Sequence, residues 1–296
     1  GKNGKANGVS AAGAPAGTLF VIGGAEDRED TKEILSRLAE RIGSGKLVVS
    51  ALASDYGDEL WEVYRKLFTS LGVKHVKHLG INHRDETSKD PRLDMLVDAK
   101  AVFFTGGDQF KITTRLGGTA LSEHIEEIYR RGGIIGGTSA GATALGEMML
   151  VVIPGAGITK VGDALHMTPG LGLAKNMIID QHFSERGRIR RLLGAVAQNP
   201  RMLGVGIDED TAVVVESDGT LHTLGSGAVY IVDRHDLSYT NISQSSFGRA
   251  LSVFGVKLHV LSSGDLFDTH SRHPASAAVS DEDSKAELRL IREEIA

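Results

Sequence analysis

The feature that most constrains the fold is a regular alternation between short apolar runs and segments in which apolar residues recur at helical spacing. The apolar runs, typical of strands buried on both faces, occupy residues 18–24, 46–53, 73–79 and 100–107. Helical spacing occurs between them at 27–43 and 58–72, and both segments stop at glycine. This order favours right-handed crossovers and parallel pairing. The sequence therefore predicts an α/β protein with a mostly parallel sheet and helices on both faces.

The alternation continues through the middle of the chain and then changes character. Further helices are expected at 122–133, 140–150 and 184–198, and further strands at 134–138, 176–183 and 202–210. After Thr211, short apolar runs joined by turn residues predict a C-terminal antiparallel β extension. No Pro/Gly/Ser-rich linker interrupts mid-chain. We therefore expect a flexible N-terminal tail at 1–17, a single α/β domain at 18–270, and a loop with a C-terminal helix at 271–296.

Composition excludes several classes of protein. The 296 residues hold 33 Lys and Arg against 38 Asp and Glu, a net charge of −5, which disfavours nucleic-acid binding by broad phosphate neutralisation. The apolar fraction of 41% and charged fraction of 24% exclude global disorder. No apolar run approaches the roughly 18 residues of a membrane span. Residues 1–17 lack the apolar core of a secretory signal, so we expect a cytoplasmic protein.

The absence of cysteine bears on catalysis. It excludes a disulfide framework, thiolate zinc sites, iron–sulfur clusters and a thiol nucleophile. The sequence also lacks an H-E-x-x-H arrangement, a P-loop lysine, and a G-x-G-x-x-G after the first strand. We therefore expect no metal and no cofactor, and any covalent catalysis must use oxygen or nitrogen.

The strongest candidate for such a nucleophile is Ser139, in the stretch GGTSAGA at 136–142. The pattern G-x-S-x-G follows a predicted strand and opens a predicted helix. A nucleophile at such a sharp turn needs small neighbours, and the helix N-terminus offers backbone N–H groups to a developing oxyanion. A glycine-rich turn that only packs tightly would give the same pattern, so both interpretations stand at this point.

A second stretch, FTGGDQF at 104–110, ends another predicted strand. Ligands of parallel sheets bind at the edge where strand C-termini gather. Gly106 and Gly107 would let the backbone approach a ligand, and Gln109 can both donate and accept hydrogen bonds. The alternative is a plain turn into a helix with Asp108 as its N-cap.

A third stretch, IIDQHFSERGRIRR at 178–191, places His182 at the end of a strand, in reach of the same edge as Ser139. A general base there would take the serine proton and return it to a leaving amine. Four arginines follow within six residues: Arg186, Arg188, Arg190 and Arg191. They indicate an anion site at the start of a helix, where cations are otherwise unfavourable, or else a solvated helix face.

A fourth stretch, GIDEDT at 206–211, holds three successive carboxylates at another strand end. Because like charges repel, at least one should have a partner, and a carboxylate that orients His182 would fit. Glu209 is the preferred candidate, with Asp208, Asp210 and the distant Asp163 as alternatives. A charged loop with Asp210 as a turn former stays open on the sequence alone.

Together these stretches resemble cyanophycinases, serine exopeptidases of the aspartyl dipeptidase (peptidase E) superfamily. The resemblance runs from about Thr18 to Ser263, and it rests on the motifs FVIGGAED, FTGGDQ, GGTSAGA, PGLGL, IIDQHFSERGR and GIDEDTA. It implies a flavodoxin-like fold akin to class I glutamine amidotransferases, with serine in place of cysteine. It also implies a homodimer.

The resemblance assigns roles to individual residues. It implies Ser139 as nucleophile and His182 as general base. Some family members have the acidic residue between serine and histidine, where this chain offers only Asp163, so Glu209 is the better candidate on position. The order Ser–His–Glu agrees with the family and differs from that of α/β-hydrolases. The oxyanion hole would use backbone N–H groups of Gly107, Asp108 and Ala140. The substrate-binding positions are Gln109, Asp180, Gln181, Arg186, Arg188 and Arg191.

The implied substrate is cyanophycin, a polyaspartate carrying arginine in isopeptide linkage on each β-carboxylate. We expect acylation of Ser139, release of β-aspartyl-arginine, and hydrolysis of the acyl-enzyme. The arginines would clamp the terminal carboxylate, and Asp180 with neighbouring carboxylates would receive substrate guanidinium groups. Two alternatives are an α-aspartyl dipeptidase on the same scaffold and a catalytically inactive polymer-binding protein.

Overall fold

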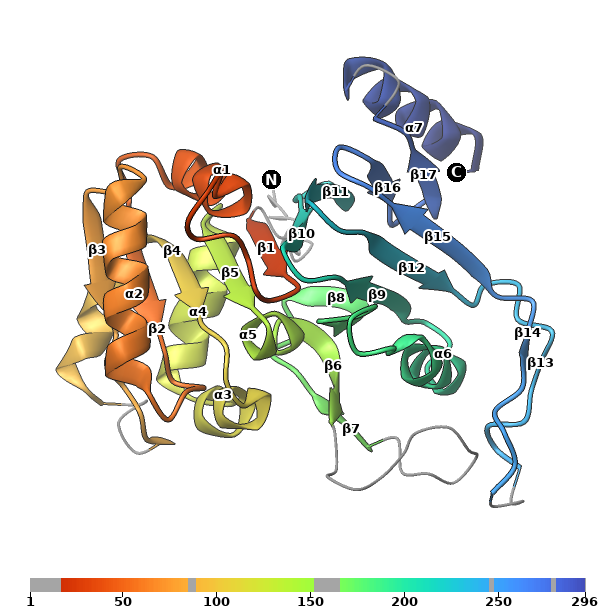
Figure 1. Ribbon diagram of the computed structural model, residues 1–296, viewed down its shortest axis with the longest axis horizontal. Coiled ribbons are helices and arrows are strands. Elements are labelled where there is room, and N and C mark those ends of the chain that lie inside the picture. The colour runs from red at the N-terminus through yellow and green to blue at the C-terminus, as the bar shows by residue number, and fades with distance from the viewer. Residues whose placement is uncertain (1–16, 85–88, 152–165, 245–247, 278–280, 296) are drawn as a thin grey trace, which may run out of the picture.

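Two sheets dominate the structure (Figure 1). The computed structural model describes residues 17–84, 89–151, 166–244, 248–277 and 281–295. The larger sheet has nine strands in the order β17-β16-β11-β10-β1-β5-β4-β2-β3, and the smaller has six in the order β15-β12-β9-β8-β6-β7. A short antiparallel pair, β13 (Tyr239–Thr240) and β14 (Val253–Phe254), lies beyond the body of the molecule.

The nine-stranded sheet contains the predicted parallel core. Its strands β3, β2, β4, β5 and β1 pair in parallel, and β10, β11, β16 and β17 extend it in antiparallel fashion. The bounds are β1 Thr18–Ile22, β2 Lys46–Ser50, β3 His75–His78, β4 Ala99–Phe104, β5 Ile134–Thr138, β10 Thr211–Val215, β11 Thr220–Gly225, β16 Leu266–Asp268 and β17 His273–Ala275. The predictions of a mostly parallel sheet and of an antiparallel extension are confirmed.

The six-stranded sheet is built around the second half of the chain. Its central strands β6, β8 and β9 run parallel, and β7, β12 and β15 are antiparallel additions. The bounds are β6 Gly146–Val151, β7 His166–Pro169, β8 Ala174–Asp180, β9 Leu203–Ile207, β12 Val229–Asp233 and β15 Lys257–Leu261. The sequence predicts one sheet, whereas β8 and β9 lie in this second one.

Helices cover the sheets. The bounds are α1 Glu33–Ile42, α2 Gly57–Ser70, a 3-10 helix η2 Pro91–Leu96, α3 Gln109–Leu116, α4 Ala120–Arg130, α5 Ala140–Thr143, α6 Ile189–Gln198 and α7 Asp281–Ile295. In Figure 1, α1 and α2 lie in front of the larger sheet and α4 lies behind it. Thr119 and Ser122 form a reciprocal capping box at the start of α4, so its N-terminus is set by local sequence.

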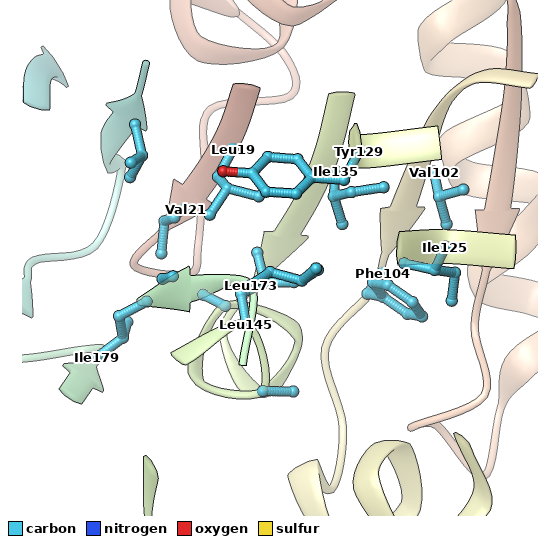
Figure 2. Close-up of a cluster of buried hydrophobic side chains, with 14 of the residues drawn as sticks. Leu19, Val21, Val102, Phe104, Ile125, Tyr129, Ile135, Leu145, Leu173 and Ile179 are labelled. Carbon is cyan, nitrogen blue, oxygen red and sulfur yellow. The ribbon is translucent and has the colours of Figure 1, made fainter. Parts of the chain in front are cut away.

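Alternation of side chains along β1 explains how the core is divided. Phe20 and Ile22 pack under α1 and α2, whereas Leu19 and Val21 point to the opposite face. On that face they belong to one buried cluster with Tyr129 and Ile125 of α4 and with residues of the smaller sheet, and Tyr129 is drawn next to Leu19 in Figure 2. A strand buried on both faces in this way has a continuous apolar sequence, which is why the sequence makes β1 recognisable.

The smaller sheet and the C-terminus account for the main departures from expectation. The sequence predicts one helix over 140–150, but α5 ends at Thr143 and β6 begins at Gly146. In β6, Met149 packs in the cluster between the sheets, and Leu150 packs in a cluster on the opposite face. Successive side chains of this segment are thus buried on opposite faces, which is the arrangement of a strand and not of a helix. Residues 273–275, expected within a loop, pair with β16 as β17.

Candidate active site

The candidate site lies where strand ends of the two sheets meet. Ser139 directly follows β5 of the larger sheet. In the smaller sheet, His182 lies two residues beyond the end of β8, and Glu209 lies two residues beyond the end of β9. Within their sheets, β5 pairs in parallel with β1 and β4, and β8 pairs in parallel with β6 and β9. The hydrogen bonds that join Ser139, His182 and Glu209 bring the C-terminal ends of β5, β8 and β9 together. The site is therefore assembled from both sheets.

Ser139 occupies a strained turn. Its φ of 54° and ψ of −117° lie in a region that few non-glycine residues adopt. Its neighbours must be glycine, because a Cβ on Gly137 would lie 2.4 Å from the Gly141 carbonyl oxygen, and one on Gly141 would lie 2.5 Å from the Phe104 carbonyl oxygen. The turn is tied to β1 through the Ser139 N–H, which donates to the Ile22 carbonyl at 3.0 Å. The small residues of GGTSAGA thus serve the turn that presents the hydroxyl.

The side chains of Ser139, His182 and Glu209 form a continuous chain of hydrogen bonds. Ser139 Oγ lies 2.9 Å from His182 Nε2, and His182 Nδ1 lies 2.7 Å from Glu209 Oε1. When Nδ1–H donates to the carboxylate, Nε2 is left to accept the serine proton. His182 is buried, with 9% of its surface exposed, whereas the Glu209 side chain keeps 39%. The arrangement can activate a serine and stabilise the imidazolium that results.

The loop after β1 fixes His182 from behind. The His182 N–H donates to the Gly23 carbonyl at 2.9 Å, and His182 itself has a positive φ of 43°. A Cβ on Gly24 would lie 2.3 Å from Cε1 of the imidazole. The ring therefore rests directly on the glycine backbone, an arrangement that any larger residue would displace.

The three successive carboxylates at 208–210, which form the acidic loop, have different hydrogen-bond partners. Asp208 accepts the Ser184 N–H at 2.9 Å and the Ala228 N–H at 3.2 Å. Asp210, with φ at 47°, accepts the Asp27 N–H at 2.8 Å and the Ser226 hydroxyl at 2.7 Å. Both aspartates thus hold loops in place, and Glu209 is the carboxylate that faces His182. The other alternative, Asp163, lies outside the described residues.

The backbone hydrogen bonds near Ser139 reduce the number of N–H groups that are available to form the predicted oxyanion hole. The Asp108 N–H donates to the Ala53 carbonyl at 2.9 Å, and the Asp108 side chain caps α3 by accepting the Phe110 N–H at 2.8 Å. The Asp108 N–H therefore already has an acceptor, which argues against its assignment to the oxyanion hole. Within the described part of the chain, the N–H groups of Gly107 and Ala140 make no backbone hydrogen bond.

The predicted substrate-binding carboxylate is instead part of the interior. Asp180 has no exposed surface and is held by a bidentate pair with Arg191, whose Nε–Oδ2 distance is 2.6 Å. It also accepts the Gln181 N–H at 3.0 Å. Asp180 is therefore paired with Arg191, and this pairing argues against the expectation that Asp180 receives a substrate guanidinium.

Arg188 belongs to the same cluster. Its guanidinium lies 3.4 Å from Asp180 Oδ1 and donates to the Gln181 carbonyl at 2.6 Å. Burial lowers the pKa of Arg188 to about 10, against the opposing attraction of Asp180. The cluster of Asp180, Arg188 and Arg191, which we call the buried ion cluster, thus fixes the segment that carries His182. Since α6 begins only at Ile189, Arg186 and Arg188 do not open a helix as predicted.

Three predicted binding positions lie outside that cluster. Arg186 is exposed and lies two residues before Arg188 of the buried ion cluster. Gln109 donates from Nε2 to the Leu150 carbonyl at 3.2 Å. Gln181 is 6% exposed, and its side-chain oxygen has no hydrogen-bond partner among the described residues. Of the six positions, Arg186 is the one that places a charged side chain in solvent.

Sequence reasoning misses one functional element, the loop that joins β1 to α1. Its motif FVIGGAED contributes to the family resemblance without indicating a role for any residue. The structure shows Gly23 and Gly24 behind the imidazole and Glu26 buried beside the serine turn. Consecutive glycines followed by a carboxylate at a strand end are the signal that could have indicated it.

Neither a metal site nor a membrane span is found in the described part of the chain. Among those residues no group of three or more His, Asp or Glu is placed to hold a metal ion. No helix within the same ranges is long and apolar enough to cross a membrane.

Comparison with known proteins identifies the family of this chain. The model of peptidase family S51 matches residues 19–223. Cyanophycinase from Synechococcus elongatus is 36% identical over 255 residues, covering 85% of this chain and 79% of the relative. Cyanophycinase from Trichormus variabilis is 38% identical over 257 residues, covering 86% of each. A crystal structure of a peptidase from an acI-B1 actinobacterium superposes with a TM-score of 0.61 at 21% identity, over 82% of this chain and 98% of that one.

The fold and these relatives define a hydrolase of the serine-type peptidase class. The chain belongs to peptidase family S51.

Proposed function

We propose that this protein is a cyanophycin-degrading serine exopeptidase. The observation that carries the proposal is the unbroken chain from Ser139 Oγ through His182 to Glu209, with distances of 2.9 Å and 2.7 Å. The substrate is supported by relatives named cyanophycinase that align with 85% and 86% of this chain. An inactive binding protein is disfavoured because it would have no need of an intact chain of this geometry.

The reaction begins with acylation of Ser139. His182 Nε2 takes the hydroxyl proton as Oγ attacks a backbone carbonyl of the polyaspartate near its chain end. Glu209 holds the Nδ1–H and stabilises the imidazolium. The N–H groups of Gly107 and Ala140 stabilise the negative charge on the carbonyl oxygen. As the tetrahedral intermediate collapses, the imidazolium protonates the leaving amine.

Deacylation repeats the same steps with water. His182 takes a proton from a water molecule, the hydroxide attacks the acyl carbonyl, and the proton returns to Ser139 Oγ. This step releases the shortened polymer with a new terminal carboxylate, since β-aspartyl-arginine has already left as the amine in the acylation step. Electrostatic stabilisation by backbone donors operates in both halves of the cycle, so one oxyanion hole serves both intermediates.

Substrate recognition divides between exposed and buried residues. Arg186, which is exposed to solvent, clamps the terminal carboxylate of the polymer. Gln109 and Gln181 contact the substrate near the cleaved bond. Asp180, Arg188 and Arg191 act indirectly, because the buried ion cluster holds Gln181 through both its N–H and its carbonyl.

The other assignments concern the whole protein. We assign residues 18–270 to one peptidase domain in a cytoplasmic homodimer. The edge strand β15 supports a dimer contact, since Leu258 and Val260 are 52% and 57% exposed on it. Sedimentation equilibrium of the parent and of a Leu258→Lys, Val260→Lys double variant tests the dimer. The molecular mass measured for the parent should be twice that of the variant.

The test of the substrate is a direct comparison of two linkages. The purified protein is given insoluble cyanophycin in one reaction and α-aspartyl dipeptides in another, and soluble products are identified by mass. Clearing of the polymer with release of β-aspartyl-arginine is the expected result. Cleavage of α-aspartyl dipeptides with the polymer left intact would instead identify an aspartyl dipeptidase.

A further inference from the structure

The loop between β1 and α1 contacts both the serine turn and the imidazole, and it carries a buried carboxylate that the proposed reaction does not use. Glu26 is 4% exposed. Its Oε2 accepts the Thr138 hydroxyl at 2.7 Å, and its Oε1 accepts the Tyr64 hydroxyl. We propose that Glu26 is a positioning residue for the nucleophile, acting through Thr138, the residue that precedes Ser139. This rests on the proposed role of Ser139.

The geometry around Thr138 shows why such an anchor matters. Thr138 is the last residue of β5, and Ser139 turns into its strained conformation immediately afterwards. The turn is held on its main chain by the bond from Ser139 N–H to the Ile22 carbonyl. Glu26 supplies a second attachment, from a side chain, on the residue just before the strain. Two attachments fix the direction in which the turn leaves the strand.

The same loop also holds the base. Gly23 accepts the His182 N–H at 2.9 Å, and Gly24 accepts the Asp210 N–H at 2.9 Å. Glu26 follows two residues later and reaches Thr138. One short segment therefore sets both the serine turn and the imidazole. Because a misplacement of about 1 Å can cost about 10²-fold in rate, a rigid segment shared by base and nucleophile directly serves catalysis.

Tyr64 completes the support from the other side. It lies on α2, packs against Phe68 and Phe103, and has the Arg28 guanidinium 5.5 Å from its ring centroid. Burial, reinforced by Glu26, raises the pKa of Tyr64 well above its ordinary value, so its hydroxyl stays a donor. A buried carboxylate with two donors is costly to place in an interior, and an apolar residue would pack the same space. Its position next to the nucleophile gives a functional reason for that cost.

The test separates positioning from packing with a matched pair at one position. Thr138→Val removes the hydroxyl and keeps the shape, whereas Thr138→Ser keeps the hydroxyl. Glu26→Gln retains the shape but presents an amide N–H to one of the two donors. Thr223→Val is the control, because it deletes a buried hydroxyl that has no partner among the described residues, on the distant strand β11.

Two rates are measured for each variant that melts near the parent. One is the second-order rate of Ser139 sulfonylation by phenylmethylsulfonyl fluoride, with Ser139→Ala as the blank. The other is turnover of cyanophycin, resolved into kcat and KM. The sulfonylation rate needs no assumption about substrate, so it decides the role of Glu26 even if cyanophycin is not cleaved.

We expect Thr138→Val and Glu26→Gln to lower sulfonylation and kcat by about 10-fold or more with KM little changed. Thr138→Ser should recover to within about 3-fold of the parent, and Thr223→Val should match the parent. The proposal is overturned if Thr138→Val reacts as fast as the parent, or if Thr138→Ser is as slow as Thr138→Val. Should Glu26→Gln not fold, the pair at Thr138 still decides between positioning and packing.

Discussion

Nδ1 of His182 and Oε1 of Glu209 lie 2.7 Å apart, although the glutamate side chain is 39% exposed while the histidine is buried. The base is thus fixed inside the protein and its carboxylate reaches it from the surface. Asp208 and Asp210, on either side, are anchored to other loops, so they hold the acidic loop and Glu209 orients the imidazole.

Replacing Glu209 should therefore damage catalysis far more than folding. We expect Glu209→Gln to lower kcat by about 10²–10⁴-fold, because the imidazole loses its orientation and the charge that stabilises its protonated form. Its melting temperature should stay close to that of the parent, since the side chain is partly exposed. Steady-state kinetics with Glu62→Gln, on the surface of α2, provide the comparison. A Glu209→Gln enzyme with parental kcat would contradict the assignment.

Gly24 offers a test of the packing behind the imidazole. Gly24→Ala should lower kcat by about 10²-fold, since the new methyl group would lie 2.3 Å from Cε1 of His182. Gly24 has a φ of 99°, so an alanine there also strains the backbone, and this strain is a second source of lost activity. Gly72→Ala is the matched control, because Gly72 has a φ of 92° and open space around it. Equal losses of activity in the two variants would attribute the effect to strain and not to the ring.

Asp180 and Arg186 should respond differently, although they lie close together in the chain. Asp180→Asn breaks the buried ion cluster and is expected to cost about 3 kcal/mol in the free energy of unfolding, together with activity. Arg186→Ala, at an exposed position, should leave stability unchanged and raise KM for cyanophycin. Urea unfolding and steady-state kinetics on both variants measure this. A fully stable Asp180→Asn protein would show that the cluster does not support the segment.

The C-terminal helix supplies a prediction about pH. Arg292 of α7 pairs with the buried Asp268, its Nε lying 2.6 Å from Oδ2. Burial pushes the pKa of Asp268 up, but hydrogen bonds from Arg292 and Ser271 outweigh it and hold that pKa well below its ordinary value. A lowered folded-state pKa gives stability that is present above the unfolded value of about 4 and is lost as the pH falls below it.

Arg292→Met should therefore reduce the free energy of unfolding at neutral pH, by about 1–3 kcal/mol, and the gap from the parent should shrink below about pH 4. Arg289→Met, at an exposed position of the same helix, is the control. Urea unfolding at neutral pH and in acid measures the gap. If the difference in the free energy of unfolding between parent and variant is the same at neutral pH and in acid, Arg292 acts through packing alone.

The sequence is informative where one local pattern determines the outcome. Continuous apolar runs predict β1, β2 and β4, and the glycines around Ser139 predict a sharp turn after β5 because the backbone there leaves no room for a Cβ. A histidine and an acidic loop after strands predict the partners of the serine. These features depend on strand ends, which the parallel topology brings together.

Features that depend on tertiary partners are beyond reach of those patterns. The segment 140–150 has helical composition, but the second sheet draws it into β6. From the sequence alone, Asp180 is a reasonable candidate for binding substrate. Its pair with Arg191 depends on the packing of α6 against the sheet, which the sequence pattern does not show. The glycines and carboxylate of the loop after β1 could indicate that the loop has a role, but they do not indicate that Glu26 binds Thr138, because these residues are 112 positions apart.

The measurement that tests the central claim most directly is the rate of cyanophycin hydrolysis by the parent and by Ser139→Ala, each at saturating polymer, with products identified by mass. If Ser139 forms the acyl-enzyme, the parent releases β-aspartyl-arginine and the variant is slower by about 10³-fold or more at an unchanged melting temperature. Equal rates in the two proteins would contradict the account, because the serine turn would then be a structural feature without a catalytic role.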